Sequence, residues 1–183
     1  MELVRDLSWV DLAVILALAV GVFAGFTQGA IVYILNCLAT IVAFIVAAQL
    51  KDPLLDLLRF WGAFTPEGRE LLVFFLLWAG LTIAAWIAIW ATYRRTRLPG
   101  PKQLDEIGGA VFGLLYVALL ISLQLVIFDS FFLEGGEGVP WLEGYYDGLN
   151  GSLIVGFFRE TLIPVVGFVM RPFVPSEIAD LLS

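Results

Sequence analysis

The residues best able to do chemistry in this chain are a few acids placed at the edges of long apolar stretches. Asp11 lies near the start of the first such stretch, and Asp105 and Glu106 come just before the fourth. Paired carboxylates can serve as a general acid and a general base, and ionisable groups inside a membrane are candidates for function. The competing interpretation, which we favour, is that these acids stabilise helix N-termini through the helix dipole. No nucleophile accompanies them in the sequence.

Several kinds of active site are excluded by composition and motif. The chain contains no histidine, which removes histidine-based catalytic triads and histidine zinc sites. The P-loop, the nucleophile elbow of hydrolases and the zinc-protease motif are also missing from the sequence. A net charge of −7 disfavours nucleic-acid binding, which needs a basic surface. We therefore predict that the protein is not an enzyme and that it binds no metal, cofactor or nucleic acid.

The elements that must position these acids are predicted to be membrane-spanning helices. Hydrophobic residues make up 61% of the chain and charged residues only 15%, whereas soluble domains are roughly half apolar. Four apolar runs match the ~20 residues that cross ~30 Å of hydrocarbon, and backbone amides in lipid must pair within a helix. We predict an all-α, polytopic bundle of about four transmembrane helices, forming one domain over residues 1–183, with spans at about 9–26, 30–50, 71–93 and 107–128.

The connections between these runs give further predictions. Only residues 27–29 separate the first two runs, and one straight helix over both would be roughly 63 Å long at 1.5 Å per residue. The chain must therefore turn near Gly25–Gly29, where glycine permits a break. We expect a tight hairpin there, with a re-entrant or steeply tilted pair as the alternative. Residues 51–70 are expected to form a short amphipathic surface helix, and residues 134–150 a loop outside the hydrocarbon.

The last apolar stretch, residues 152–170, is predicted to be an amphipathic helix that lies at the interface or is partly docked. Arg159 and Glu160 stand at its centre, where charges are costly in hydrocarbon. Pro164 removes the helical hydrogen bond to the Glu160 carbonyl. A fifth span is the alternative for this segment.

The positions of the basic residues predict the orientation. Arg94, Arg95, Arg97 and Lys102 crowd the short loop between the third and fourth runs, whereas six basic residues are dispersed on the opposite side. Because density near helix ends counts for more than the total, we place this loop in the cytoplasm. Both termini are then predicted to lie outside it.

Small residues recur in steps of four along the apolar runs. Such steps stay close to one helix face and let neighbouring backbones approach each other. We expect these residues to pack the bundle; the alternative is homodimerisation through the first run. The residues are Ala13, Ala17, Gly21, Gly25 and Gly29 in the first run, Ala39, Ala43 and Ala47 in the second, Gly80, Ala84 and Ala88 in the third, and Gly109 and Gly113 in the fourth.

Neutral polar residues also occur within the apolar runs. Side chains of this kind commonly form hydrogen bonds between membrane helices. We expect that role, rather than the lining of a pore, for Asn36, Thr40, Gln49, Thr82, Ser122 and Gln124.

Two groups of residues together resemble the colicin V production protein (CvpA) family. Trp9-Val10-Asp11, followed by Gly21, Gly25 and Gln28-Gly29, resembles the first helix of that family. Asp105, followed by Gly109-Ala110-Val111-Phe112-Gly113, resembles its fourth-helix signature, and the resemblance covers about residues 9–170. Two positions depart from the pattern: family members commonly carry arginine in place of Gln28 and often in place of Tyr116.

The resemblance implies a protein of the bacterial cytoplasmic (inner) membrane that supports colicin V production or export and envelope maintenance. Its expected partners are the lipid bilayer and either a second copy or a secretion or envelope protein. The alternative function is a small channel or transporter with a polar site near Asp11, Gln28 and Asp105, because broken helices can mark ion sites.

Overall fold

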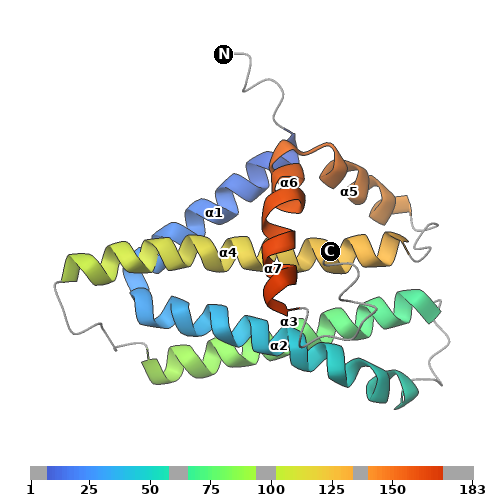
Figure 1. Ribbon diagram of the computed structural model, residues 1–183, viewed down its shortest axis with the longest axis horizontal. Coiled ribbons are helices and arrows are strands. Elements are labelled where there is room, and N and C mark those ends of the chain that lie inside the picture. The colour runs from blue at the N-terminus through green and yellow to red at the C-terminus, as the bar shows by residue number, and fades with distance from the viewer. Residues whose placement is uncertain (1–7, 58–65, 94–101, 134–139, 171–183) are drawn as a thin grey trace.

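The computed structural model describes residues 8–57, 66–93, 102–133 and 140–170 (Figure 1). All regular structure in these ranges is helical: α1 (Trp9–Gln28), α2 (Ala30–Leu57), α3 (Pro66–Tyr93), α4 (Lys102–Leu133), α5 (Pro140–Asn150), α6 (Leu153–Phe157), the π-helix η1 (Phe158–Leu162) and α7 (Ile163–Met170). Four helices of the described ranges, α1 to α4, are long and apolar enough to cross a membrane. The predicted all-α, multi-pass class is confirmed.

The outer surface of the bundle is apolar. On α1, the side chains of Leu16 and Phe23 are 67% and 70% exposed, and Ile83 and Ile87 stand out from α3 in the same way. Monomeric soluble proteins rarely expose apolar surface so continuously. Lipid tails are therefore the solvent that fits this surface.

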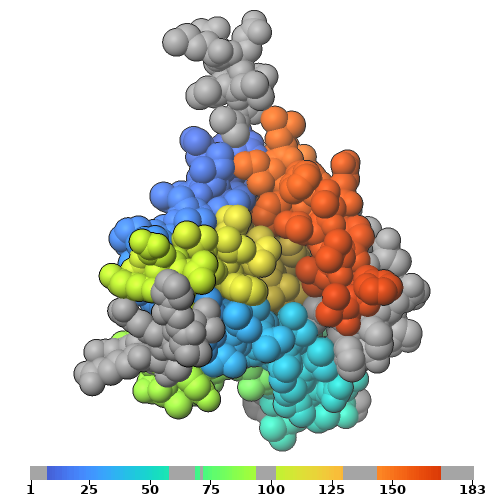
Figure 2. All heavy atoms as spheres, turned by 60° about the vertical axis from the view of Figure 1, so that its left-hand side comes forward, coloured from blue at the N-terminus to red at the C-terminus, as the bar shows by residue number. Residues whose placement is uncertain are grey.

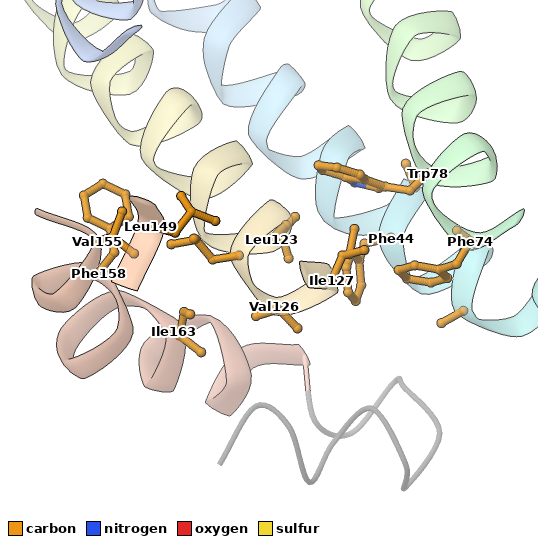
Figure 3. Packing of buried hydrophobic residues seen from close by; sticks show 14 of the residues in the cluster. Phe44, Phe74, Trp78, Leu123, Val126, Ile127, Leu149, Val155, Phe158 and Ile163 are labelled. Atoms are coloured by element: carbon orange, nitrogen blue, oxygen red, sulfur yellow. The ribbon is translucent and has the colours of Figure 1, made fainter. Parts of the chain in front are cut away.

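The arrangement of the helices is set mainly by α2 and α4. Helix α2 packs between α3 and α4. Helix α1 runs diagonally to the other three helices and packs mainly on α4 (Figure 1). The rings of Phe44, Phe74 and Trp78 join α2 to α3, with Phe44 centred 5.1 Å from Phe74 and 6.3 Å from Trp78 (Figure 3). Edge-to-face contacts of this kind are favourable beyond the area that they bury.

The turn between the first two runs lies at Gly29, within the predicted stretch. Gly29 has φ +90°, a conformation that side chains other than glycine rarely adopt. The predicted tight hairpin is wrong, however, because α1 and α2 diverge from this residue and α1 makes its main contact with α4 (Figure 1). The closer backbone approach that α1 makes with α4 decides the arrangement, as described below.

The predicted surface helix over residues 51–70 is also wrong. Helix α2 continues through Pro53 to Leu57, α3 begins at Pro66, and residues 58–65 lie outside the described ranges. Lys51 is only 7% exposed, and its Nζ lies 2.5 Å from a carboxylate oxygen of Glu70 on α3. Pairing satisfies the buried charge, which allows α2 to extend past the lysine.

The predicted loop over residues 134–150 contains a helix. Helix α5 covers Pro140–Asn150, and residues 134–139 are not described. The Tyr145 ring is centred 5.5 Å from Phe128 and 6.1 Å from Trp9, and Leu149 is buried. This packing outweighs the low helix propensity of the glycines in the segment.

The C-terminal stretch forms a helix, as predicted, and it runs across α4 rather than along it (Figure 1). Its buried residues Val155, Phe158 and Ile163 join the core around Leu123 and Val126 (Figure 3). The space-filling view in Figure 2 shows these helices, orange to red, against the side of α4. By length and composition, the bent pair of Gly144–Asn150 and Leu153–Val169, with an angle of 68°, also passes as one broken span.

Proline is accommodated in this segment by a local change of helix type. The Ile163 N–H donates to the Phe158 carbonyl, five residues back, where the chain forms η1. Wider turns of this kind occur as single insertions in α-helices. The π-turn comes directly before Pro164, the residue that cannot donate a helical hydrogen bond.

Candidate functional site

Most of the predicted site residues lie in one antiparallel contact between α1 and α4. A Cβ atom added to Gly25 would overlap the carbonyl oxygen of Gly109, and one added to Gly21 would lie 2.7 Å from the Gly113 carbonyl oxygen. The two backbones touch because neither helix carries a side chain at these points, which is how small residues serve membrane helices. The structure shows the expected packing role for these glycines of α1 and α4. A second copy would have to displace α4 to use these glycines. The expected packing role is wrong for the third run, because Gly80, Ala84 and Ala88 are exposed on the surface of α3.

The contact ends at a polar corner formed by Asp105 and the break between α1 and α2. The Asp105 side chain is buried, and its Oδ1 accepts a hydrogen bond of 3.0 Å from the N–H of Ala30. A Cβ on Gly29 would lie 2.7 Å from the Oδ2 atom of Asp105. Glycine is thus needed at position 29 both for its positive φ and for the space that the carboxylate takes. Asp105 lies in the first turn of its own helix α4, as predicted, and its hydrogen bond to Ala30 also completes the N-terminus of α2.

Glu106 and Gln28, the two polar residues next to this corner, do not form a catalytic pair with Asp105. Glu106 forms an ion pair with Lys102 on the same helix, with 3.2 Å between the Nζ and Oε1 atoms. Gln28 is half-buried, and its side-chain oxygen is buried without a hydrogen-bond partner among the described residues. Asp105 and Glu106 therefore have separate partners, and the acid–base interpretation of this pair finds no geometry to support it.

Asp11 forms the second polar corner, and no part of its side chain is exposed. Its Oδ2 accepts hydrogen bonds of 2.8 Å from both the N–H and the hydroxyl of Ser8. Its Oδ1 accepts from the Ser152 hydroxyl at 2.6 Å and from the Ile154 N–H at 2.9 Å. Ser152 in turn caps α6 by accepting from the Val155 N–H at 3.1 Å. One carboxylate thus completes the N-termini of α1 and α6 together.

The role of Asp11 at α1 was predicted, but Ser152 was missed. Ser152 follows Gly151 and directly precedes an apolar run, which is a helix-start pattern. That pattern signals a cap at position 152 without identifying the acid that joins it.

The two corners lie at opposite ends of the α1–α4 contact. Asp105 meets Gly29 at the end of α1, whereas the residues around Asp11 share a cleft with Ile121 and Leu125 of α4. At 1.5 Å per residue, Asp105 and Ile121 are roughly 24 Å apart along α4. Asp11 therefore does not share a cavity with Gln28 and Asp105, and the channel alternative loses the single site on which it was based.

A third polar cluster surrounds Arg159 and was not predicted. Its guanidinium donates to both carboxylate oxygens of Asp129 on α4, at 2.6 and 3.0 Å, and to the Asn150 side-chain oxygen at 2.6 Å. Its Cζ atom also lies 5.6 Å from the centre of the Tyr146 ring. Burial, together with the Asp129 carboxylate, raises the pKa of the Tyr146 hydroxyl above its ordinary value. This bidentate pairing neutralises the arginine that interrupts the last apolar stretch.

The neutral polar residues of the spans behave in different ways. Thr40 of α2 is hydrogen-bonded to the Tyr116 hydroxyl of α4, as expected for an interhelical contact. Ser122 instead donates to the Ala118 carbonyl of its own helix at 2.9 Å. Asn36 and Thr82 are buried, yet the Asn36 amide atoms and the Thr82 hydroxyl have no partner among the described residues. The predicted interhelical hydrogen bonds are wrong for Ser122, Asn36 and Thr82.

Asp11 and Asp105 serve structure in this arrangement. Both oxygens of Asp11 are occupied by N–H and O–H donors, and Asp105 accepts from a backbone amide. Within the part of the chain that the structure describes, no three His, Cys, Asp or Glu side chains are grouped as metal ligands. What the arrangement can do is hold helices in a fixed register.

Comparison with known proteins identifies the family of this bundle. The family model described as Colicin V production protein matches residues 10–163. The matched region contains the glycine contact, both acid corners, and the Ser152 and Arg159 contacts. No curated protein and no solved structure matches the chain.

Proposed function

Because this chain belongs to the colicin V production protein family, we propose that it supports the production or export of a colicin V-type toxin from the bacterial cytoplasmic (inner) membrane. In the same membrane it contributes to envelope maintenance. Its role is non-catalytic: it acts as a rigid helical frame that engages a partner.

The observation that carries this proposal is the use of both acids as helix caps. A catalytic carboxylate needs a free oxygen within reach of a substrate, whereas Asp11 accepts four hydrogen bonds from Ser8, Ser152 and Ile154. Asp105 lies against Gly29 at the turn between α1 and α2. The polar positions that resemble the family pattern thus support a scaffold.

The surfaces left for a partner include the lipid-facing sides of α1 and α3. The exposed face of α3 includes Gly80, and nothing lies within 4 Å of a Cβ atom added there. Small residues on an open membrane face permit close helix–helix association. The partner would be a second copy of this chain or a secretion or envelope protein.

The proposed orientation places the loop between α3 and α4 in the cytoplasm and both termini outside, from the density of basic residues in that loop. Reporter enzymes of known compartment fused to the C-terminus test it. An active cytoplasmic reporter at that terminus would reverse the orientation.

The function is tested by deleting the gene in a colicin V-producing strain and measuring toxin release and growth under detergent stress. We expect both to fall, and to be restored by the wild-type chain and by Gly80→Ala. Gly25→Leu, which forces α1 away from α4, should not restore them. Unchanged toxin release and stress tolerance in the deletion strain would contradict the proposal.

A further inference from the structure

A groove between α3 and α4 lies halfway along the spans. Its volume is about 310 Å³, and its walls include Trp78, Thr82 and Trp86 of α3 and Tyr116 of α4. Helices α3 and α4 make few contacts with each other, which leaves this α3–α4 groove between them. Thr82 is ten residues from Leu72, the first residue of its apolar span. At 1.5 Å per residue it lies about 15 Å deep, near the bilayer midplane.

The walls of the groove carry polar atoms without partners. Among the described residues, neither the Thr82 hydroxyl nor the Trp78 indole N–H has a hydrogen-bond partner, although the two residues are only 9% and 5% exposed. Buried polar groups of native proteins nearly always have one. Both residues line the groove, but the two polar atoms themselves are buried, so side-chain rotation must bring them to a molecule bound there.

A third unpartnered group stands beside Tyr116. Asn36 lies on the face of α2 between Tyr33 and Thr40, and both of these contact Tyr116, through a ring distance of 5.7 Å and a hydrogen bond respectively. The Asn36 residue is 2% exposed, and neither atom of its amide has a partner among the described residues. Asn36 does not line the groove itself, so an occupant that uses its amide, a donor and an acceptor, must extend past Tyr116 toward α2.

The surroundings limit the chemistry of the occupant. Ile83 and Trp86 of the lining are exposed on the lipid-facing surface, at 57% and 42%, so the occupant must show an apolar surface to lipid and polar atoms to the protein. Water alone would place its outer side against hydrocarbon, and charged headgroups do not reach this depth. A neutral molecule with a polar ring and an apolar tail satisfies both sides.

We propose that the α3–α4 groove binds a neutral, membrane-soluble ring compound with a hydrocarbon tail, the chemistry of an isoprenoid quinone. Its ring carbonyls accept from the Thr82 hydroxyl and the Trp78 N–H, and its ring packs against the indoles and Tyr116. Rotation of Thr82 about χ1 exchanges its hydroxyl with its methyl group, which turns the donor into the groove. This binding is separate from the proposed toxin-production role and requires only that α3 spans the membrane.

The test is binding of decylubiquinone to the purified full chain in lipid nanodiscs, measured as a rise in thermal unfolding temperature with ligand concentration. We expect saturable stabilisation of the wild type and at least 10-fold weaker apparent affinity for Thr82→Val and Asn36→Leu. Because these polar groups have no partner among the described residues of the free protein, neither variant should unfold at a lower temperature without ligand. The matched control is Thr27→Val, since the exposed Thr27 hydroxyl bonds to the Ala24 carbonyl of its own helix.

Several results would overturn the proposal. One is no stabilisation of the wild type by decylubiquinone, and another is equal stabilisation of the wild type, Thr82→Val and Asn36→Leu. Equal stabilisation by decylbenzene, which has the tail but no carbonyls, would show a groove for an alkyl chain alone. A change of oligomeric state in Thr82→Val, without a change in decylubiquinone binding, would assign the groove to a second copy.

Discussion

Adding one methyl group at Gly25 should separate α1 from α4. In Gly25→Ala the new Cβ atom would overlap the Gly109 carbonyl oxygen and lie 3.0 Å from the Gly113 Cα atom. All of these neighbours are backbone atoms, so no side chain can rotate away to make room. The two helices must move apart along their whole contact, which also loosens the approach of Gly21 to Gly113.

The expected loss of stability follows from two opposing contributions. Inserting a methyl group into a packed contact costs about 1–3 kcal/mol, and a backbone-only contact belongs near the upper end. Alanine is a better helix former than glycine by about 1 kcal/mol, which offsets part of that cost. The net destabilisation is about 2 kcal/mol. For a chain of this size, that lowers the unfolding temperature by about 4–8 °C.

The matched control is Gly80→Ala, which makes the same chemical change in a span where nothing lies within 4 Å of the new Cβ atom. It should leave the free energy of unfolding unchanged or raise it by up to about 1 kcal/mol. Thermal unfolding of both variants in the same detergent, followed by far-ultraviolet circular dichroism, measures the difference. Equal unfolding temperatures for the two variants would refute the assignment of Gly25 to a backbone contact with α4.

Three further substitutions test the polar corners through the same unfolding measurement. Asp105→Ala removes the acceptor for the Ala30 N–H and should cost about 1–2 kcal/mol, most of which Asp105→Asn should restore; equal loss in both would contradict a capping role. Asp11→Ala leaves the buried Ser152 hydroxyl without its acceptor and should cost about 3 kcal/mol, with faster proteolysis of the C-terminal helices; an unchanged cleavage rate would argue against this contact. Gln28→Leu removes a buried oxygen that has no partner in the part of the chain that the structure describes, so stability should hold or rise by up to about 1 kcal/mol, and a clear loss would show that the oxygen is hydrogen-bonded.

The spans and the glycine contact could be predicted from sequence because both depend on local patterns. Hydropathy over about 20 residues identifies a span wherever it lies in the fold. Steps of four place Gly21 and Gly25 on one face of α1 without knowledge of the partner helix. Length required a break, since no bilayer accepts a helix as long as the two runs together, and the glycines placed it near Gly25–Gly29.

The partners across the fold could not be predicted, because they join residues far apart in the chain. Asp105 is 75 residues from Ala30, and Asp11 is 141 residues from Ser152. The pattern around each acid is compatible with capping its own helix, and nothing local identifies a second helix. Helix α5 was missed for a related reason: its glycines and acids predict a loop, whereas Tyr145 packs against Trp9 and Phe128 from elsewhere in the chain.

The two acid corners explain how a contact made of glycines acquires a defined register. Bare backbones form smooth surfaces without side-chain knobs, so the α1–α4 contact alone resists sliding weakly. Asp105 fixes one end by bonding to Ala30 just past α1. Asp11 fixes the other by bonding to Ser152 ahead of α6, and the continuation of α6 through η1 and α7 packs on α4. Sliding α1 by one residue would move both carboxylates about 1.5 Å relative to their donors, beyond hydrogen-bonding reach. Acids and glycines are therefore required together, because close approach comes from the glycines and position along the axis comes from the acids.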